Sequence, residues 1–229
     1  MIKNIARPLL AATLLALAAG AAQADQIAVT SYDTPNGDGQ AHGGTYNYWD
    51  TPYSGSASAG ATNIDGITTG GNALSGGTGK LTDGVIASDY WGNTSNSAGT
   101  GPWVGWLQSP TITFHFAGNV DLTEIKFYVD NSGIGGVSAP DVVIVDGVSF
   151  ANTLYQTPGG ATTLSTIDIT GLDLHSDSVT VTLQQSNAWV FLSEVQFFSS
   201  TSAVPETGNL AMMLGGLSLL GFMARRRRG

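Results

Sequence analysis

The chain has 229 residues, a formal net charge of −9, no cysteine and 31 glycines. The lack of cysteine excludes a disulfide scaffold, a zinc finger, an iron–sulfur site and a thiol nucleophile. The negative charge argues against nucleic acid as a partner, because phosphate contacts need clustered lysine and arginine. A hydrophobic content of 42% is enough for one domain with a core of its own.

The charge is distributed unevenly along the chain. Six of the eight basic residues lie near the two ends, whereas all seventeen acidic residues lie between Asp25 and Glu206. Only Lys80 and Lys126 lie in that interval, so two lysines against seventeen carboxylates give it a formal charge of −15. We therefore expect no ligand held by arginine side chains, and an anionic surface that repels anions.

Residues 1–24 have the pattern of a secretory signal peptide. Lys3 and Arg7 give a positive start, and the apolar run from 9 to 19 is too short to span a bilayer comfortably. Ala22 and Ala24 form a small-x-small cleavage site before Asp25. The pattern predicts an exported protein; the alternative is a buried N-terminal helix.

The C-terminal end reads as a membrane-directed sorting signal over residues 204–229, after a polar stalk at 200–203. It begins with Val204, Pro205, Glu206 and Thr207, continues with an apolar segment at 210–224, and ends with four arginines at 225–228. The apolar segment would make a helix of about 22 Å, shorter than a hydrocarbon core of about 30 Å. We expect a transmembrane helix that holds the protein at the inner membrane, with the arginines cytoplasmic, until processing releases it to the cell surface or medium. The alternative is an anchor that is never cut.

This tail resembles the PEP-CTERM sorting signal of Gram-negative bacteria, in which a Pro-Glu-Pro motif precedes a short helix and an arginine-rich end. Pro205 and Glu206 match that motif, and Thr207 stands where the second proline is usual. The resemblance implies an exosortase-type sorting enzyme as a partner, in bacteria that make extracellular polysaccharide. Residues 204–208 also look like the sortase signal of Gram-positive bacteria, but the length of the tail favours the first reading.

Residues 25–199 are predicted to form one all-β domain. Apolar residues alternate with polar ones over 112–116, 125–129 and 179–183, which is the pattern of half-buried strands. The run from 189 to 198 is apolar on both faces, which predicts a central strand. Residues 33–80 are rich in small polar residues and are predicted to be irregular loops. Many short strands separated by turns indicate an antiparallel β-sandwich or jelly roll.

Several segments in this domain resemble the discoidin, or coagulation-factor type C, domain, a member of the galactose-binding-like fold. The resemblance spans residues 80–198 and rests on 81–85, Trp91, 106–108, 112–116 and 191–197. It implies an eight-stranded antiparallel jelly-roll β-sandwich with ligand-binding loops at one end. It also implies a structural calcium ion held by Asp83 and Glu194, with Ser88 and Asp89 where a neighbouring oxygen ligand is often found.

Calcium is also reasonable from the residues alone, because it takes six to eight oxygen ligands and a glutamate within an apolar strand needs a partner. The alternative is that Glu194 points to solvent and Asp83 only shapes a turn. The acidic stretch of Asp33, Asn36, Asp38 and Asp50 lacks EF-hand spacing and is interpreted as ordinary loop structure.

Aromatic residues are frequent in the predicted loops. Tyr48, Trp49 and Trp103 are candidates for stacking against sugar rings, whereas the resemblance favours core packing for Trp91 and Trp106. The alternative for the three candidates is also packing, since aromatic side chains dominate protein cores.

No catalytic motif is present: there is no nucleophile elbow, and Leu81 follows Gly79-Lys80 where a P-loop needs Ser or Thr. We therefore predict a non-catalytic surface or matrix protein that binds polysaccharide. The alternatives are a passive coat protein without a specific ligand and, as the weaker one, a glycan-active enzyme.

Overall fold

The computed structural model describes residues 24–57, 73–153, 164–199 and 216. The chain divides into two units, of which residues 25–199 form the one described below. The predicted signal peptide, stalk and sorting signal lie outside the described residues, apart from Ala24 and Gly216. Among the residues that the structure describes, no helix is long and apolar enough to cross a membrane.

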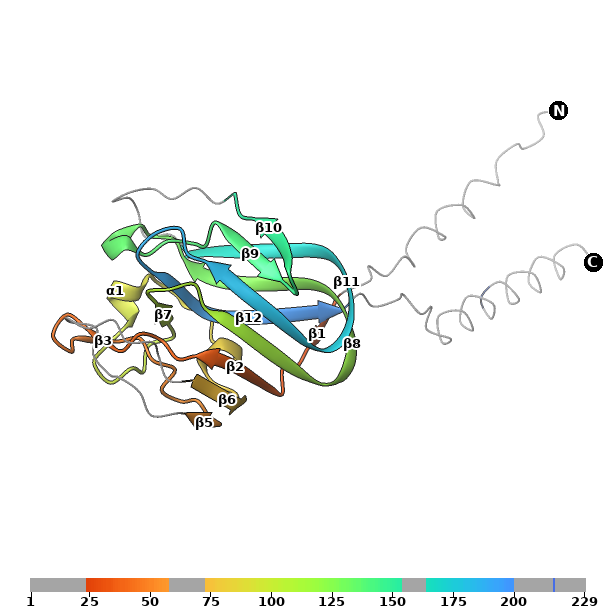
Figure 1. The fold of residues 1–229 in the computed structure, drawn as a ribbon, viewed down its shortest axis with the longest axis horizontal. Helices are drawn as coiled ribbons and strands as arrows, with labels where there is room; N and C mark the ends of the chain where they lie inside the picture. The colour runs from red at the N-terminus through yellow and green to blue at the C-terminus, as the bar shows by residue number, and fades with distance from the viewer. Residues whose placement is uncertain (1–23, 58–72, 154–163, 200–215, 217–229) are drawn as a thin grey trace, which may run out of the picture. The chain divides into compact units, whose positions relative to one another are not determined.

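The described part of this unit consists mainly of antiparallel β-strands (Figure 1). Three short helical turns occur between the strands: η1 (Lys80–Thr82), α1 (Trp91–Thr94) and η2 (Ile134–Gly136). The strands are β1 (Asp25–Ile27), β2 (Ser31–Pro35), β3 (Gln40–Ala41), β4 (Tyr46–Asn47), β5 (Ser56–Ala57), β6 (Ala73–Gly77), β7 (Val104–Trp106), β8 (Thr111–Asp130), β9 (Val142–Val145), β10 (Val148–Ala151), β11 (Leu164–Gln184) and β12 (Val190–Ser199).

Two long strands organise the sheet. β8 has 20 residues and β11 has 21, and they pair antiparallel from Thr111–Thr182 at one end to Asp130–Leu164 at the other. A straight strand of 20 residues extends about 65 Å, far more than a domain with a radius of gyration of about 16 Å can hold. The pair therefore bends, and its register shifts between Thr170 and Ser178.

Each half of this bent pair belongs to a different layer. The half of β8 at 111–116 lies beside β2, which pairs with β6, and β6 pairs with β5. The matching half of β11 pairs with β9, and β9 pairs with β10 at the edge of the sheet. The half at 124–130 lies beside β12, which also pairs with β1 and β7. The apolar sides of the two layers face each other, since the rings of Phe114 on β8 and Phe197 on β12 are 4.9 Å apart.

The alternation in the sequence sets this core. Ile112, Phe114 and Phe116 are buried in one layer, and Ile125, Phe127 and Val129 are buried in the other. Every residue of β12 from 190 to 195 is also buried. The predictions of an all-β antiparallel domain, of these strands and of a central last strand are therefore confirmed. Residues 33–80 differ from prediction, because β2 and β6 within them are regular strands of the main sheet.

A second, aromatic cluster lies at one end of the sandwich. Its buried members come from the β3–β4 hairpin and the residue after it, the loop between η1 and α1, α1 itself, the segment before β7, the segment after η2, and the start of β12: Ala41, Tyr48, Ala87, Trp91, Trp103, Val137 and Phe191. We call this the loop end; α1, β3 and β7 gather there, at the left of Figure 1. The paired residues Asp25 of β1 and Ser199 of β12 lie at the opposite end.

Candidate functional site

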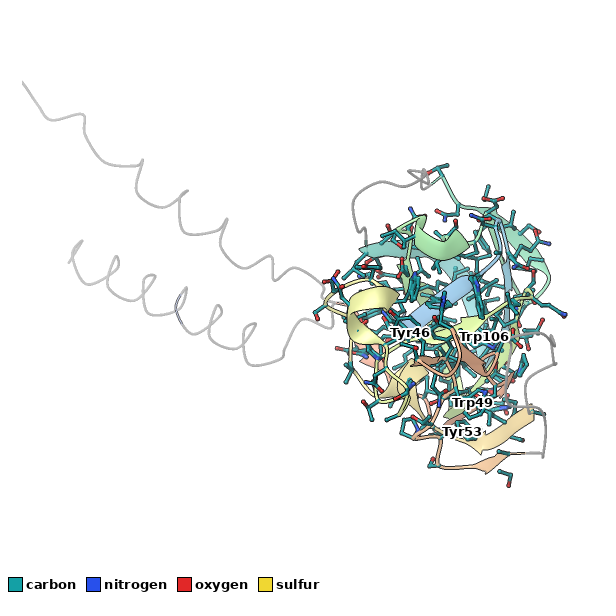
Figure 2. All side chains as sticks on the ribbon, turned by 90° about the vertical axis from the view of Figure 1, so that its left-hand side faces the viewer. Tyr46, Trp49, Tyr53 and Trp106 are labelled. Carbon is teal, nitrogen blue, oxygen red and sulfur yellow. The ribbon has the colours of Figure 1, made fainter. Side chains whose placement is uncertain are left out.

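The loop end contains a cavity of about 240 Å³. Three groups of residues line it: the β3–β4 hairpin and its continuation, the start of α1, and the segments around η2 and the start of β12. The lining residues are Ala41, His42, Tyr48, Trp91, Gly135, Val137, Trp189 and Phe191. Tyr48, Trp91, Val137 and Phe191 are buried and form the inner wall. His42, Gly135 and the partly buried Trp189 are the more exposed members, so they form the rim. Figure 2 looks onto this end, with Tyr46 beside α1.

Backbone and side-chain hydrogen bonds fix Trp91 in the wall of this aromatic pocket. Its amide donates to Asp130 Oδ2 at 2.8 Å, and its indole Nε1 donates to the carbonyl of Ile134 at 3.1 Å. Gly135 then passes close to the ring: a Cβ there would lie 2.8 Å from the Trp91 ring, and its φ of +64° also favours glycine. Trp91 and the η2 turn are therefore held against each other.

The β3–β4 hairpin supplies the other wall. His42 has a φ of 52°, and its ring stacks on Trp91 with the centroids 6.2 Å apart. The Tyr48 carbonyl accepts a hydrogen bond from the amide of Gly105 on β7 at 3.2 Å, which anchors the tyrosine to the sandwich. A Cβ on Gly105 would lie 2.1 Å from the Phe191 ring, so this position has room only for glycine.

The three residues predicted to stack against sugars have different surroundings in the structure. Tyr48 lines the pocket, but it is only 2% exposed. Trp103 is 1% exposed, and its Nε1 donates to Thr94 Oγ1 at 2.9 Å and to the Asp89 carbonyl at 3.3 Å. The centroid of its ring also lies 6.5 Å from that of Phe191. Trp103 is therefore a core residue and not an open surface for stacking against a sugar. Trp49 is partly buried and is not among the residues that line the pocket.

Three pocket residues were not predicted to bind a ligand: His42, Trp91 and Trp189. Trp91 was assigned to packing, and it does belong to the second cluster while also lining the pocket. Trp189 precedes β12 and forms a parallel bridge with Val137. No spacing rule relates these three positions, because the fold brings them together from segments far apart in the chain.

The loop after η1 is held on β12 by two backbone amides. Gly84 N donates to Glu194 Oε2 at 3.1 Å, and Ala87 N donates to Ser193 Oγ at 3.3 Å. Glu194 is 2% exposed, so the alternative in which it points to solvent does not hold. Burial raises the pKa of Glu194 to about 7; the amide of Gly84 opposes that rise, and the negative charge of Asp83 adds to it. The structure thus brings Asp83 and Glu194 together.

The other two predicted calcium ligands have different surroundings. Ser88 is exposed, and both carboxylate oxygens of Asp89 accept hydrogen bonds, from Tyr90 N at 2.8 Å and Asn93 Nδ2 at 2.7 Å. Within the described residues, no three His, Cys, Asp or Glu side chains are grouped as a metal site. Thr82, next to Asp83, has a buried hydroxyl that finds no hydrogen-bond partner there. The oxygens of Asp83, Glu194 and Thr82 suit calcium chemically, whereas both carboxylate oxygens of Asp89 already accept hydrogen bonds within the loop.

The acidic stretch at 33–50 holds the loops together. Asp50 Oδ1 accepts the amide of Lys80 at 2.9 Å, its other oxygen accepts the hydroxyl of Tyr32, and its own amide donates to Asn36 Oδ1 at 2.7 Å. Lys80 is 3% exposed, and its Nζ donates to the Trp49 carbonyl at 2.6 Å. Burial lowers the pKa of Lys80 to about 8, opposed by the charges of Asp50 and Asp83. These contacts agree with an interpretation as loop structure.

No protein-family model matches this sequence, and no curated protein is detectably similar to it. Several solved structures align with part of the chain. The CBM32 domain of AlyQ in complex with 4,5-unsaturated mannuronic acid aligns over 76% of this chain and 98% of that domain, with 12% identity and a TM-score of 0.36. The lectin domain of lectinolysin complexed with Lewis B antigen aligns over 65% of this chain and 94% of that domain, with 14% identity and a TM-score of 0.36.

A longer structure, truncated AlyQ with CBM32 and alginate lyase domains, aligns over 78% of this chain with 12% identity and a TM-score of 0.38. This chain spans only 34% of that protein. The chemistry of the pocket rests on the residues of this chain.

Proposed function

We propose that this protein is an exported, non-catalytic module that binds polysaccharide at its loop end. The observation that supports this function best is the aromatic pocket. Its volume of about 240 Å³ is below the range of about 300–1,000 Å³ typical of drug-sized ligands, so it suits one sugar unit or a substituent of one.

The pocket offers a sugar both apolar and polar contacts. The ring of Trp189 at the rim can pack against the C–H face of a pyranose, while the buried rings of Trp91 and Phe191 exclude water from beneath it. Indole N–H and imidazole nitrogen atoms, as in Trp189 and His42, are hydrogen-bonding groups for hydroxyls. This combination of few polar groups on an aromatic wall is typical of small-ligand sites.

The loop that carries Asp83 is proposed to hold a structural calcium ion together with Glu194. Two carboxylates and the unpartnered hydroxyl of Thr82 would supply hard oxygens, and backbone carbonyls or water would complete the coordination. Calcium binding would keep Glu194 ionised in its buried position and fix the loop after η1. Ser88 and Asp89 are proposed not to bind the ion directly but to hydrogen-bond water or loop groups around it.

Export and sorting are proposed from the sequence. Residues 1–24 would direct the chain across the inner membrane, and the tail at 204–229 would hold it there until an exosortase-type enzyme processes it. The mature domain would then act at the cell surface or in the extracellular matrix, where polysaccharide is the available ligand. Mass spectrometry of the exported protein tests both steps, because it shows whether the chain begins at Asp25 and lacks the arginine block.

Affinity electrophoresis of residues 25–199 in gels that contain different polysaccharides tests the binding function. At least one glycan should retard the wild-type protein, and Trp189→Ala should abolish the retardation while Trp49→Ala, outside the pocket, leaves it unchanged. A passive coat protein, the main alternative, would migrate equally in all gels. A glycan-active enzyme would instead release reducing ends from the same panel.

A further inference from the structure

We propose that the aromatic pocket selects an ammonium-bearing sugar, so that its ligand is a polysaccharide with free amino groups instead of a neutral or acidic one. This inference rests on the proposed polysaccharide binding and names the chemical class of the ligand. Three features of the described residues support it: the angles between the pocket rings, the charges around the pocket, and the polar groups that line it.

Most ring pairs of the pocket meet at steep angles, whereas the His42 ring stacks nearly parallel on Trp91, at an interplanar angle of 9°. The interplanar angle is 86° between Tyr48 and Trp91, 69° between Tyr48 and Trp189, and 83° between Trp189 and Phe191, with centroids 5.2–6.1 Å apart. A flat sugar ring can lie against only one such surface. A compact cation can contact several rings at once, and each electron-rich face attracts it. The pocket thus has the geometry of an aromatic cage.

Among the residues that the structure describes, no lysine or arginine lines the pocket. Residues 25–199 contain only two lysines and no arginine, and both lysines are engaged elsewhere. Lys80 is buried and donates to the Trp49 carbonyl, while Lys126 forms an ion pair with Glu124 at 2.7 Å on the outer face of β8. A cationic ligand would therefore meet no lysine or arginine side chain in the cage.

Carboxylates lie directly behind the wall of the cage. Asp130 accepts the amide of Trp91 at 2.8 Å, and Asp89 accepts the amide of Tyr90, one residue before it. With the formal charge of −15 over residues 25–206, they make the potential around the pocket negative. This potential attracts an ammonium group and repels uronic acid or sulfate.

The lining side chains with polar atoms are His42, Tyr48 and Trp189. The lining has no carboxylate, amide or guanidinium group to bond several hydroxyls in the buried part of the pocket. We infer that the sugar ring stays at the rim near Trp189 and that its ammonium group enters the cage, where water at the mouth satisfies its remaining N–H groups.

Matched oligosaccharides test this inference. The tetramers of glucosamine and of N-acetylglucosamine are titrated into residues 25–199 at about pH 6, where an amine is protonated, and tryptophan fluorescence and calorimetry report binding. The glucosamine tetramer should bind at least about tenfold more tightly, and added salt should weaken it. Trp189→Leu should remove this preference, Trp189→Phe should keep most of it, and Trp49→Ala should leave it unchanged. Circular dichroism checks that each variant is folded.

Each outcome decides between the two proposals. Equal or tighter binding of the N-acetylated tetramer would overturn the ammonium preference and leave polysaccharide binding standing. Binding of neither tetramer, nor of any polysaccharide in the gels, would overturn both. If tetramethylammonium binds in the pocket but no sugar does, the cage is real and the assignment of an amino sugar is wrong.

Discussion

The buried carboxyl group of Glu194 predicts an unusual dependence of stability on pH. Its pKa is raised from the ordinary 4.5 to about 7 by burial, so the folded state binds its proton more tightly than the unfolded state does. Stability from this group is therefore fully present below pH 4.5 and is lost as the pH rises through 7. The shift corresponds to about 3 kcal/mol, since each pKa unit is worth about 1.4 kcal/mol.

Glu194→Gln removes the titration but keeps an oxygen that can accept the amide of Gly84. In EGTA, the variant and wild type should have similar stability near pH 4.5, and the variant should be more stable by up to about 3 kcal/mol at pH 8. For a domain of this size, that difference raises the melting midpoint by about 6–12 °C. Thermal melts of both proteins across this pH range measure it, and taking the difference cancels the other titrating groups.

Two further measurements test whether the effect comes from the buried carboxylate of Glu194. Glu124→Gln, at a partly exposed position, controls for the loss of one negative charge and should not reproduce the effect. Calcium at pH 8 should stabilise wild type much more than Glu194→Gln, because a carboxylate is a stronger calcium ligand than the neutral amide oxygen of glutamine. Parallel stability curves for wild type and Glu194→Gln in EGTA would show that Glu194 is not desolvated as the structure has it.

Three other predictions follow from packing and burial. Phe197→Ala should lower the free energy of unfolding by about 3–5 kcal/mol in urea titrations, because Phe197 is fully buried against Phe114. The control Phe198→Ala, at a partly buried position next to Lys126, should lower it far less. Equal losses in the two variants would contradict the two-layer core. Gly105→Ala should displace Phe191, since the added Cβ would overlap that ring, and the polysaccharide gel should no longer retard the protein. Unaltered retardation would mean that the pocket wall is not as described. Wild type should gain stability relative to Lys80→Met as the pH rises from 8 to 10.5. Burial lowers the pKa of Lys80 to about 8, so the folded state favours the neutral amine in this range. A stability difference between the two proteins that does not change with pH would show that Lys80 is not buried.

The sequence predicted the parts of the fold that depend on local alternation. Residues 112–116 and 125–129 alternate with period two, and the structure buries the expected side chains of both segments. It could not show that both segments belong to one strand, β8, because the exposed, glycine-containing stretch between them resembles a turn. β2 was missed for a related reason: its residues are mostly polar, and hydrogen bonds to neighbouring strands place it in the sheet.

The site was less predictable than the fold. Asp83 and Glu194 were paired only through the resemblance. In the structure the amide of Gly84, next to Asp83, donates to Glu194 across 110 residues of chain. The pocket could not be foreseen, because Trp91 and Trp189 meet only when the two layers are assembled. Composition also cannot distinguish an aromatic ring that lines a cavity, such as Trp91, from one that fills the core, such as Trp103.

The pairing of β1 with β12 determines how the pocket would be displayed. Asp25 and Ser199 are opposite each other on neighbouring strands, so the domain begins and ends at one place, and that place is the end away from α1 and β3 (Figure 1). A tether that continues the chain after Ser199, as proposed, would be attached at the end of the domain away from the pocket. Tension on a bound glycan would pass through the length of the sandwich to the tether, and the β1–β12 pair would bear that load at the point of attachment.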